Sequence, residues 1–205
     1  MPIPVDHFTL ESGYWTDRYR SEDTPWDLGE VSPPLKEYFD SISKRGLKIL
    51  VPGAGSGHEV QYLHQIGFSE VFYLDFSPEA ARKFSQNHPT FPPSNIFAGD
   101  FFQQSGSYDL IVEQTFFCSF HPGKELRSRY AEKAAELLKP AGKLIGLWWN
   151  FPLEKDQTSP PYGGSMEEYC DLFQPYFSNV RFFPCRNSHP SREGKEYFAI
   201  MEKRG

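Results

Sequence analysis

The chain has 205 residues, a length that one hydrophobic core can still organise, so we expect one domain or one domain with a docked arm. Aromatic residues make up 17% of the chain and prolines number 18, which favours a folded protein with rigid loops, because disordered chains lack aromatics. The formal net charge is −6 and no lysine or arginine stripe is present, so nucleic acid and anionic membrane surfaces are not expected partners.

The residues from 32 onward alternate between short apolar runs and helical patterns. The predicted helices are at residues 32–45, 58–66, 77–87, 123–138 and 166–173. Ser32 and Ser77 are predicted N-caps, since each is followed by proline at the first helical position. The predicted strands are at residues 47–51, 71–75, 95–97, 108–112, 143–149, 180–183 and 196–201, and residues 139–142 are expected to separate the helix before them from the strand after them.

This alternation predicts an α/β fold with a mostly parallel seven-stranded sheet and helices on both faces. The last two strands are joined by a polar loop at residues 187–195, so we expect them to form an antiparallel hairpin at the sheet edge. In such folds ligands bind outside the carboxyl ends of the strands. The residues that follow the strands are therefore the candidates for chemistry.

A glycine-rich turn, Gly53-Ala54-Gly55-Ser56-Gly57-His58, follows the first strand and opens a helix. Glycines let the backbone turn sharply and approach a ligand closely, although a tight connection without a ligand would use the same residues. The dinucleotide pattern requires a third glycine where His58 stands, and no Gly-Lys-Ser/Thr triplet follows. A pyrophosphate site of either kind is therefore disfavoured.

Two acids end the next two strands. Asp75 can accept both hydroxyls of a ribose, and Asp100 is placed to accept an exocyclic adenine amine. Each acid could instead be solvated at a strand end or cap the following helix. Their combination with the glycine turn is more specific than any one of the three.

These motifs, taken in order, resemble those of the Rossmann-like class I S-adenosylmethionine-dependent methyltransferases. The matching segments are Val51–Glu59, Asp75, Gly99-Asp100 and Leu137–Leu144. Further segments narrow the resemblance: Thr24–Gly29, Phe116-Phe117-Cys118, Arg127–Ala131 and Pro160–Gly164. With these, nearly the whole chain from about Tyr14 resembles the thiopurine S-methyltransferase family, most closely its thiol and halide methyltransferase branch.

The resemblance implies S-adenosylmethionine as cofactor, S-adenosylhomocysteine as product, and a set of residues that bind them. Residues 1–31 would form an arm that covers the cofactor, and residues 32–205 would form the methyltransferase domain. The implied cofactor-binding residues are Trp15, Tyr19 and Trp26 on the arm, Gly53, Gly55 and Gly57 in the turn, and Asp75, Phe76, Asp100, Phe101 and Glu113 after the later strands.

The acceptor is expected beside the fourth strand. The implied substrate-binding residues are Gln114, Phe117, Cys118 and Tyr162. Two positions depart from the family pattern: Tyr19 stands where the branch often has tryptophan, and Gln114 stands where the thiopurine enzymes carry an arginine. The second departure argues against a thiopurine acceptor.

The predicted activity is methyl transfer to a small soft nucleophile such as a thiol, sulfide, thiocyanate or halide. No catalytic dyad is evident, which suits a nucleophile that does not require a general base. The alternatives are N- or O-methylation of a small metabolite, and a non-catalytic S-adenosylmethionine-binding protein. Cys118 and His121 could also be a nucleophile and base or half of a zinc site, but no third group accompanies them, and neither a metal nor a covalent mechanism is expected.

Several further expectations concern the surroundings of the site and the cell. Trp148 and Trp149 could line the acceptor pocket or pack in the core. Arg127 and Arg129 are expected to be solvated, although an arginine near the loop after the fourth strand could instead attract an anionic acceptor. Three scattered cysteines cannot form a disulfide framework, and Met1–His7 lacks the pattern of a secretory signal. No apolar run approaches the ~20 residues of a membrane span. We therefore expect a cytoplasmic protein, monomeric or weakly homodimeric, whose partner is a small molecule.

Overall fold

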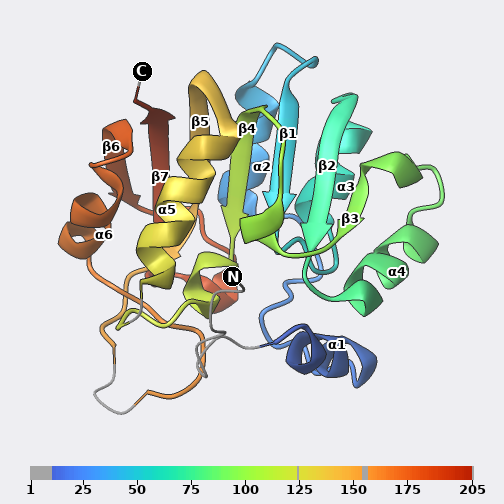
Figure 1. The fold of residues 1–205 in the computed structure, drawn as a ribbon, viewed down its shortest axis with the longest axis horizontal. Helices are drawn as coiled ribbons and strands as arrows, with labels where there is room; N and C mark the ends of the chain where they lie inside the picture. Colours follow the sequence, from blue (N-terminus) through green and yellow to red (C-terminus); the bar gives the residue numbers. More distant parts are fainter. Residues whose placement is uncertain (1–10, 124, 154–156, 205) are drawn as a thin grey trace, which may run out of the picture.

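The computed structural model describes residues 11–123, 125–153 and 157–204, which form a seven-stranded sheet (Figure 1). The strand order is β3-β2-β1-β4-β5-β7-β6. The strands are β1 (Lys48–Pro52), β2 (Glu70–Asp75), β3 (Ile96–Ala98), β4 (Tyr108–Gln114), β5 (Leu138–Trp149), β6 (Phe177–Pro184) and β7 (Glu196–Lys203). The first five strands pair in parallel, and β7 pairs antiparallel with both β5 and β6. The predicted sheet and its antiparallel hairpin at the edge are confirmed.

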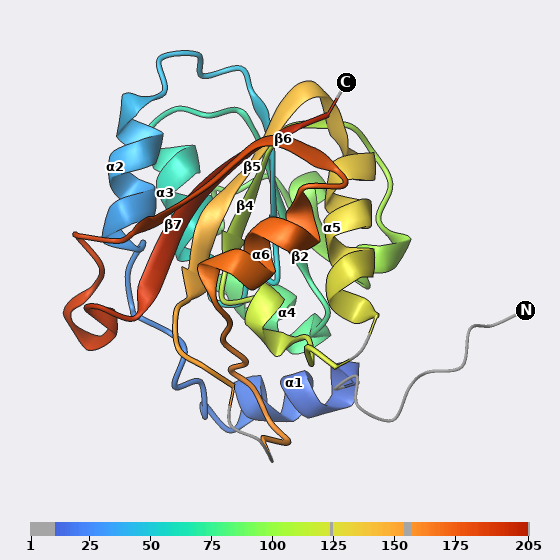
Figure 2. The same ribbon diagram turned by 90° about the vertical axis from the view of Figure 1, so that its left-hand side faces the viewer.

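Helices cover both faces of the sheet (Figure 2). They are α1 (Ser12–Arg20), α2 (Pro33–Ser41), α3 (His58–Gln65), α4 (Pro78–Asn87), α5 (Leu126–Leu137) and α6 (Met166–Phe173). In Figure 2, α2 and α3 lie on one side of the sheet and α5 and α6 on the other. The central strands contain continuous apolar runs, Ile49-Leu50-Val51 in β1 and Leu110-Ile111-Val112 in β4, so side chains on both faces of the sheet are buried.

Each face of the sheet has its own hydrophobic core. On one face, Phe39 of α2, Leu63 of α3 and Phe84 of α4 pack together. On the other, Tyr130 of α5 and Phe173 of α6 pack against the same strands. Many of the aromatic residues noted in the sequence therefore belong to these two cores.

The two predicted helix caps have different outcomes. The Ser77 hydroxyl accepts the backbone N–H of Ala80 at 3.2 Å, so this cap is confirmed. Ser32 is at the predicted N-cap position with Pro33 at the first helical position, but its hydroxyl is buried without a hydrogen-bond partner and makes no capping bond. Instead the backbone N–H of Ser32 donates to Glu59 on α3, and α2 begins at Pro33 because proline already provides the helical φ.

The junction between α5 and β5 also differs from the prediction. Helix α5 begins at Leu126 rather than at residue 123, and β5 begins at Leu138 with no intervening loop. Leu138 pairs with Tyr108, and the register then shifts before Leu110 pairs with Lys143. Ala141 has a φ of 59°, so the segment expected as a break is an irregular part of the strand.

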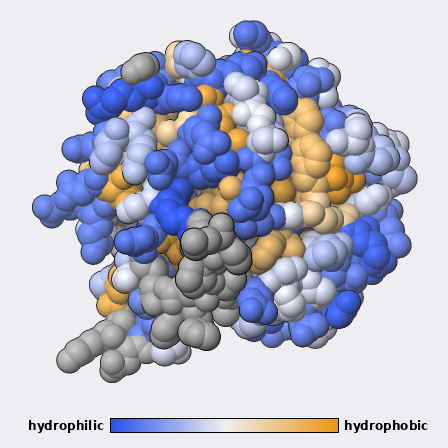
Figure 3. Space-filling model, in the orientation of Figure 1, coloured by the Kyte–Doolittle hydropathy of each residue, from blue (hydrophilic) through white to orange (hydrophobic). Residues whose placement is uncertain are grey.

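The connection from β3 to β4 contains a 3-10 turn (Phe101–Gln103) and no α-helix. In the space-filling view, apolar atoms gather in front of the β2–β3 part of the sheet (Figure 3). Phe72 and Phe97 stack there with their ring centroids 6.0 Å apart.

The carboxyl ends of the parallel strands meet at the lower edge of Figure 1, and α1 lies beneath them. The sequence patterns contained no prediction of α1. Within the described residues, no helix is both long and apolar enough to cross a lipid bilayer.

Candidate active site

All three glycines of the turn after β1 adopt a left-handed backbone conformation. Gly53, Gly55 and Gly57 have φ values of 59°, 54° and 75°, a region that side chains disfavour. A Cβ on Gly53 would lie 2.6 Å from the Phe116 ring. A Cβ on Gly55 would meet the Tyr19 hydroxyl, whereas one on Gly57 would collide with Phe84 in the core. Gly53 and Gly55 thus border the site, and Gly57 serves packing.

Asp75 holds this turn in place. One carboxylate oxygen accepts the N–H of Gly55 and the other accepts the N–H of Ser77, both at 2.8 Å. The side chain is 6% exposed, and burial raises its pKa to about 6 even though both backbone bonds favour the anion. Each oxygen still has a lone pair, so the carboxylate can accept further hydroxyl groups.

The arm places aromatic side chains over the turn. A narrow pocket of about 40 Å³ lies between arm and turn, and the lining from the arm includes Tyr19 and Trp26. The Trp26 indole N–H donates to the Tyr19 hydroxyl at 3.4 Å, and the Trp15 ring packs edge-on against Trp26 at 5.4 Å. The three arm residues expected at the cofactor therefore form one aromatic group, of which Tyr19 and Trp26 line the pocket.

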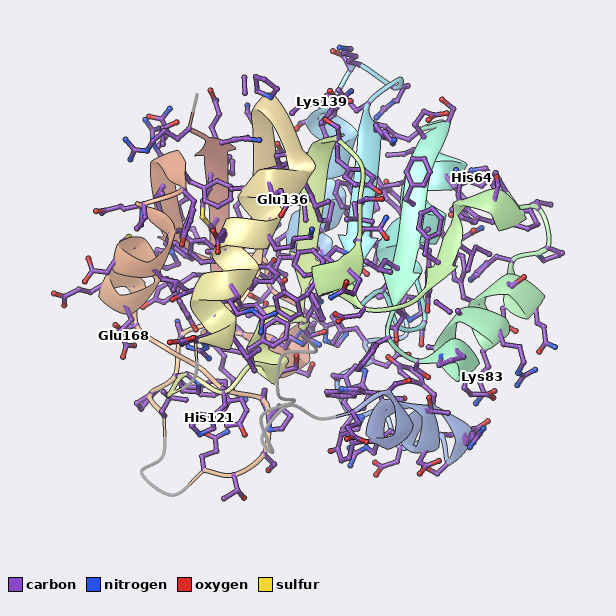
Figure 4. All side chains as sticks on the ribbon, viewed as in Figure 1. His64, Lys83, His121, Glu136, Lys139 and Glu168 are labelled. Atoms are coloured by element: carbon purple, nitrogen blue, oxygen red, sulfur yellow. The ribbon has the colours of Figure 1, made fainter. Side chains whose placement is uncertain are left out.

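Helix α1 is anchored on α4 and on the turn before it. Lys83, labelled in Figure 4, extends from α4 toward α1 and donates to the Tyr19 carbonyl at 2.6 Å. The hydroxyls of Thr16 and Ser77 are 3.1 Å apart. Ser12 donates to the carbonyl of Phe76, whose ring is 37% exposed. The backbone of Phe76 thus supports the arm.

A polar network that the sequence did not predict contributes to the lining of this pocket, through Asp27, Ser56 and His58. Asp27 accepts the Gly29 N–H at 2.8 Å, accepts the Ser56 hydroxyl, and lies 2.7 Å from Nε2 of His58. Burial would raise the pKa of Asp27, but these bonds outweigh it and hold the pKa below its usual range. The Asp27 bond also raises the pKa of His58. In the sequence, His58 was notable only as a departure from the dinucleotide pattern, which gave no sign of a partner 31 residues away.

The adenine candidates occupy the start of the 3-10 turn after β3. The Asp100 carboxylate accepts the N–H of Phe102 at 2.9 Å and caps this turn. The Phe101 side chain is buried against Tyr130, with ring centroids 5.3 Å apart. In the structure Asp100 caps the turn and Phe101 packs in the core, and the cofactor role of both residues remains a prediction.

Glu113 at the end of β4 is fully buried on the α5 side of the sheet. Its carboxylate accepts the N–H groups of Phe116 and Phe117 at 2.8 and 2.7 Å and the Tyr130 hydroxyl at 2.7 Å. Burial raises its pKa to about 7. These bonds shape the turn after β4 rather than present the carboxylate to the pocket.

The neighbouring Gln114 and Thr115 do line the pocket. The side-chain oxygen of Gln114 is buried and has no hydrogen-bond partner, so a donor on a ligand could satisfy it. Thr115 has a φ of 57°, an unfavourable value for a β-branched residue. The Glu113 carboxylate accepts the N–H groups of Phe116 and Phe117, the two residues after Thr115, and these bonds maintain the conformation of Thr115.

The other acceptor candidates are packed behind this turn. Phe117 is buried in the core against Tyr130 of α5. The carbonyl of Cys118 accepts the N–H of Tyr162 at 2.8 Å, and the His121 and Tyr162 rings lie 5.0 Å apart, with His121 labelled in Figure 4. The structure brings Cys118 and Tyr162 together, but neither they nor Phe117 is among the residues that line the pocket.

Cys118 is a poor candidate for a nucleophile. Burial, followed by the charge of Glu113, raises the pKa of its thiol to about 12. Its Sγ lies 3.2 Å from the carbonyl oxygen of Thr115. Across the three described ranges, no three His, Cys, Asp or Glu side chains form a group that could hold a metal ion.

Arg127 was expected to be solvated, and this expectation is wrong. Its guanidinium is buried and donates to the carbonyls of Phe120, Tyr162 and Gly163 at 3.0–3.1 Å. These three carbonyls, from two loops, replace water around the positive charge of Arg127, which explains why its side chain can be buried. Trp148 is likewise core, packed edge-on against Phe173 at 5.8 Å.

The site suits an adenosyl cofactor. A buried carboxylate at the end of β2, a glycine-rich turn after β1, and the Tyr19 and Trp26 rings over that turn are the groups that such a ligand would need. Together with a sheet in which β7 runs antiparallel, these features define a Rossmann-like class I methyltransferase.

Comparisons with known proteins specify the family. The Thiopurine S-methyltransferase family matches residues 10–196. The chain is 32% identical to Thiocyanate methyltransferase 1 of Arabidopsis thaliana over 96% of this chain and 87% of that protein. It is 34% identical to Probable thiol methyltransferase 2 of the same plant, over 77% and 70%. A Burkholderia thailandensis 1,6-didemethyltoxoflavin-N1-methyltransferase shares the fold, with a TM-score of 0.73 at 14% identity, over 95% of this chain and 87% of that chain.

The chain therefore belongs to the thiopurine S-methyltransferase family. It is an S-adenosylmethionine-dependent methyltransferase, as the sequence motifs predicted.

Proposed function

We propose that the protein transfers a methyl group from S-adenosylmethionine to a thiol or a comparable soft anion, such as sulfide, thiocyanate or a halide. The observation that carries this proposal is the similarity to Thiocyanate methyltransferase 1, which extends over 96% of the chain. Gln114, at the position where the thiopurine enzymes carry an arginine, argues against a thiopurine as acceptor.

S-adenosylmethionine supplies a methyl group on a sulfonium, which a nucleophile can displace. The residues that would hold this cofactor are Asp75 at the ribose, Gly53 and Gly55 at the methionine end, and Tyr19 and Trp26 as the cover. Aromatic rings beside a sulfonium add attraction of about 0.5–2 kcal/mol. Covering rings also exclude water from the reacting groups.

The nucleophile needs little help from the protein. A thiol with a pKa of ~8.5 is already partly ionised near neutral pH, and halides and thiocyanate carry no proton to remove. The protein then acts mainly by positioning, which can lower a barrier by roughly 7–11 kcal/mol. The high pKa of Cys118 is consistent with this, because a protonated thiol does not compete with the acceptor for the methyl group.

An acceptor panel with a product assay tests the proposal. The purified protein is incubated with S-adenosylmethionine and, separately, a small thiol, sulfide, thiocyanate, iodide, an amine and a phenol, and S-adenosylhomocysteine is quantified. We expect turnover with at least one of the first four. Turnover with only the amine or phenol would indicate N- or O-methylation, and binding without turnover would indicate a non-catalytic binding protein.

We further propose that residues 1–31 form an arm over a single domain of residues 32–205, of which residues 1–10 lie outside the described ranges. The contacts of α1 with α4 support this division. We also propose that the protein works in the cytoplasm as a monomer or weak homodimer, without nucleic acid or membrane partners. Its described cysteines are free thiols, which suits a reducing compartment. Sedimentation at several concentrations and cell fractionation test these points.

A further inference from the structure

Hydrogen bonds hold the arm segment Trp26-Asp27 from two sides. From one side, the Arg192 guanidinium donates to the carbonyl of Trp26 at 2.5 Å. From the other, Ser56 and His58 bind the Asp27 carboxylate. Ser56 and His58 belong to the glycine turn and α3, whereas Arg192 belongs to the loop between β6 and β7, the antiparallel hairpin at the edge of the sheet.

We propose that Arg192 and Asp27 are positioning residues that clasp the arm over the pocket, so that the C-terminal hairpin controls how fast cofactor and product exchange. The clasp is the set Asp27, Ser56, His58 and Arg192. The proposal rests on the proposed function, because it takes the pocket under the arm as the cofactor site.

The surroundings of Arg192 favour an oriented donor. Arg192 and Glu196 are 4% and 2% exposed and form an ion pair at 3.3 Å. The guanidinium carbon also lies 5.1 Å from the centre of the Trp149 ring. Burying an ion pair contributes little net stability, and the second carboxylate oxygen of Glu196 has no hydrogen-bond partner. The arrangement is therefore poorly explained by stability alone, yet it aims one N–H group of Arg192 at the arm.

The contact on the Asp27 side is charged. The depressed pKa of Asp27 keeps its carboxylate ionised, so its bonds to His58 and Ser56 are charge-assisted. Because the Asp27 oxygen that meets His58 also accepts the Gly29 N–H, the same bonds order the chain just after Trp26. Loss of either the Arg192 bond to Trp26 or the Asp27 bonds to the glycine turn and α3 would leave residues 26–29 less restrained.

The size of the pocket explains why the clasp must open. The space between arm and turn is about 40 Å³, whereas pockets for ligands of cofactor size are typically ~300–1,000 Å³. The Tyr19 hydroxyl and the Phe116 ring pack directly on Gly55 and Gly53. Entry of a cofactor therefore requires the arm to withdraw, and the bonds of the clasp oppose that movement.

The test compares Arg192→Lys and Asp27→Asn with two matched controls, Arg186→Lys on the same C-terminal loop and Asp17→Asn on an exposed face of the arm. Lysine keeps the charge beside Glu196 but lacks the planar fork that reaches two partners. Dissociation of S-adenosylhomocysteine is followed by stopped-flow tryptophan fluorescence. We expect both clasp variants to release it about tenfold faster than wild type and both controls to match wild type.

A second readout needs no cofactor. Hydrogen exchange at the amides of residues 27–29 in the free protein is expected to be about tenfold faster in both clasp variants. Dissociation and exchange rates within twofold of wild type would overturn the clasp. Failure of the wild type to bind S-adenosylhomocysteine would instead refute the proposed function, and the exchange experiment would still decide the clasp.

A further variant covers the case in which Arg192→Lys does not fold. The double substitution Arg192→Met with Glu196→Gln removes both buried charges together, which proteins often tolerate better than losing one. We expect the same acceleration of exchange, and an unchanged rate in this folded variant would also overturn the proposal.

Discussion

The carboxylate of Asp75 accepts the backbone N–H of Gly55 at 2.8 Å, so the acid that ends β2 holds the glycine turn that follows β1. Two motifs 20 residues apart are thus one structural unit. Any substitution at Asp75 changes the shape of the turn as well as the groups available to a ribose.

Asp75→Asn is expected to weaken S-adenosylmethionine binding about tenfold or more. The amide can accept only at its oxygen, so the N–H of Gly55 or Ser77 would face an NH₂ group, at a cost of about 1–3 kcal/mol. Calorimetric titration measures the affinity. Glu70→Gln, at the exposed start of the same strand, is the control, and equal affinities in the two variants would contradict a role for Asp75 at the site.

Glu113 is expected to make folding stability depend on pH. Burial raises its pKa from 4.5 to about 7, so the folded protein binds more protons than the unfolded chain between these values. Stability from this group is therefore present below about pH 4.5 and is lost as the pH rises through about 7, by up to about 3 kcal/mol.

Urea denaturation at several pH values measures this effect. Glu113→Gln mimics the protonated acid and should lack the loss, so its stability relative to wild type should increase with pH. Glu132→Gln on the exposed face of α5 serves as control. A constant difference between wild type and Glu113→Gln across the range would show that the carboxylate is ionised throughout.

Substitutions at Gly57 and Gly55 should affect stability and cofactor affinity to different extents. Gly57→Ala is expected to cost about 2–4 kcal/mol of stability, because its φ is 75° and its Cβ would collide with Phe84. Gly55→Ala should also lose some stability, because its φ is 54°, but it should in addition reduce cofactor affinity, because its Cβ meets the Tyr19 hydroxyl, and Tyr19→Phe in the same chain should partly restore that affinity. Gly46→Ala, with nothing within 4 Å, is the control. Thermal unfolding and titration of the four variants check these effects.

His58 should make cofactor affinity fall at high pH. The Asp27 bond raises its pKa, so the charged pair is complete below the ordinary histidine pKa of about 6.5 and is lost as the pH rises through the raised value. Glu59 and Glu30 also favour the charged ring, and the nearby His88 has its own pKa lowered, first by burial and then by His58.

The measurement is the dissociation constant of S-adenosylmethionine at about pH 6 and about pH 9 for wild type and His58→Gln. We expect a several-fold loss of affinity in wild type and a smaller one in the variant, which corrects for titration of the ligand itself. The same loss in both proteins would exclude the Asp27–His58 pair as its cause.

Arg127→Gln should affect the acceptor side of the site. The substitution removes the guanidinium that binds the carbonyls of Phe120, Tyr162 and Gly163, so the loop that carries Tyr162 should loosen. We expect the KM for the acceptor to rise about tenfold while S-adenosylmethionine affinity stays within about twofold. Arg129→Gln, on the same helix, is the control, and a proportional loss of cofactor affinity would point to general unfolding instead.

The sequence by itself determined the order of strands and helices from α2 onward, the glycine turn and the acids at the strand ends. These signals are local: hydrophobic periodicity depends on neighbouring residues, and the positive φ values at Gly53, Gly55 and Gly57 favour glycine whatever surrounds them. The motif series was equally readable, because each motif is contiguous.

Only the tertiary structure decided which distant side chains meet. Asp27 and His58 are 31 residues apart, and Arg192 and Trp26 are 166 apart, so no spacing rule relates them. The burial of Arg127, expected in solvent, depends on two loops that supply three carbonyls to its guanidinium. A charged residue is buried or exposed according to what packs around it, and that is set by the whole fold rather than by its neighbours in the chain.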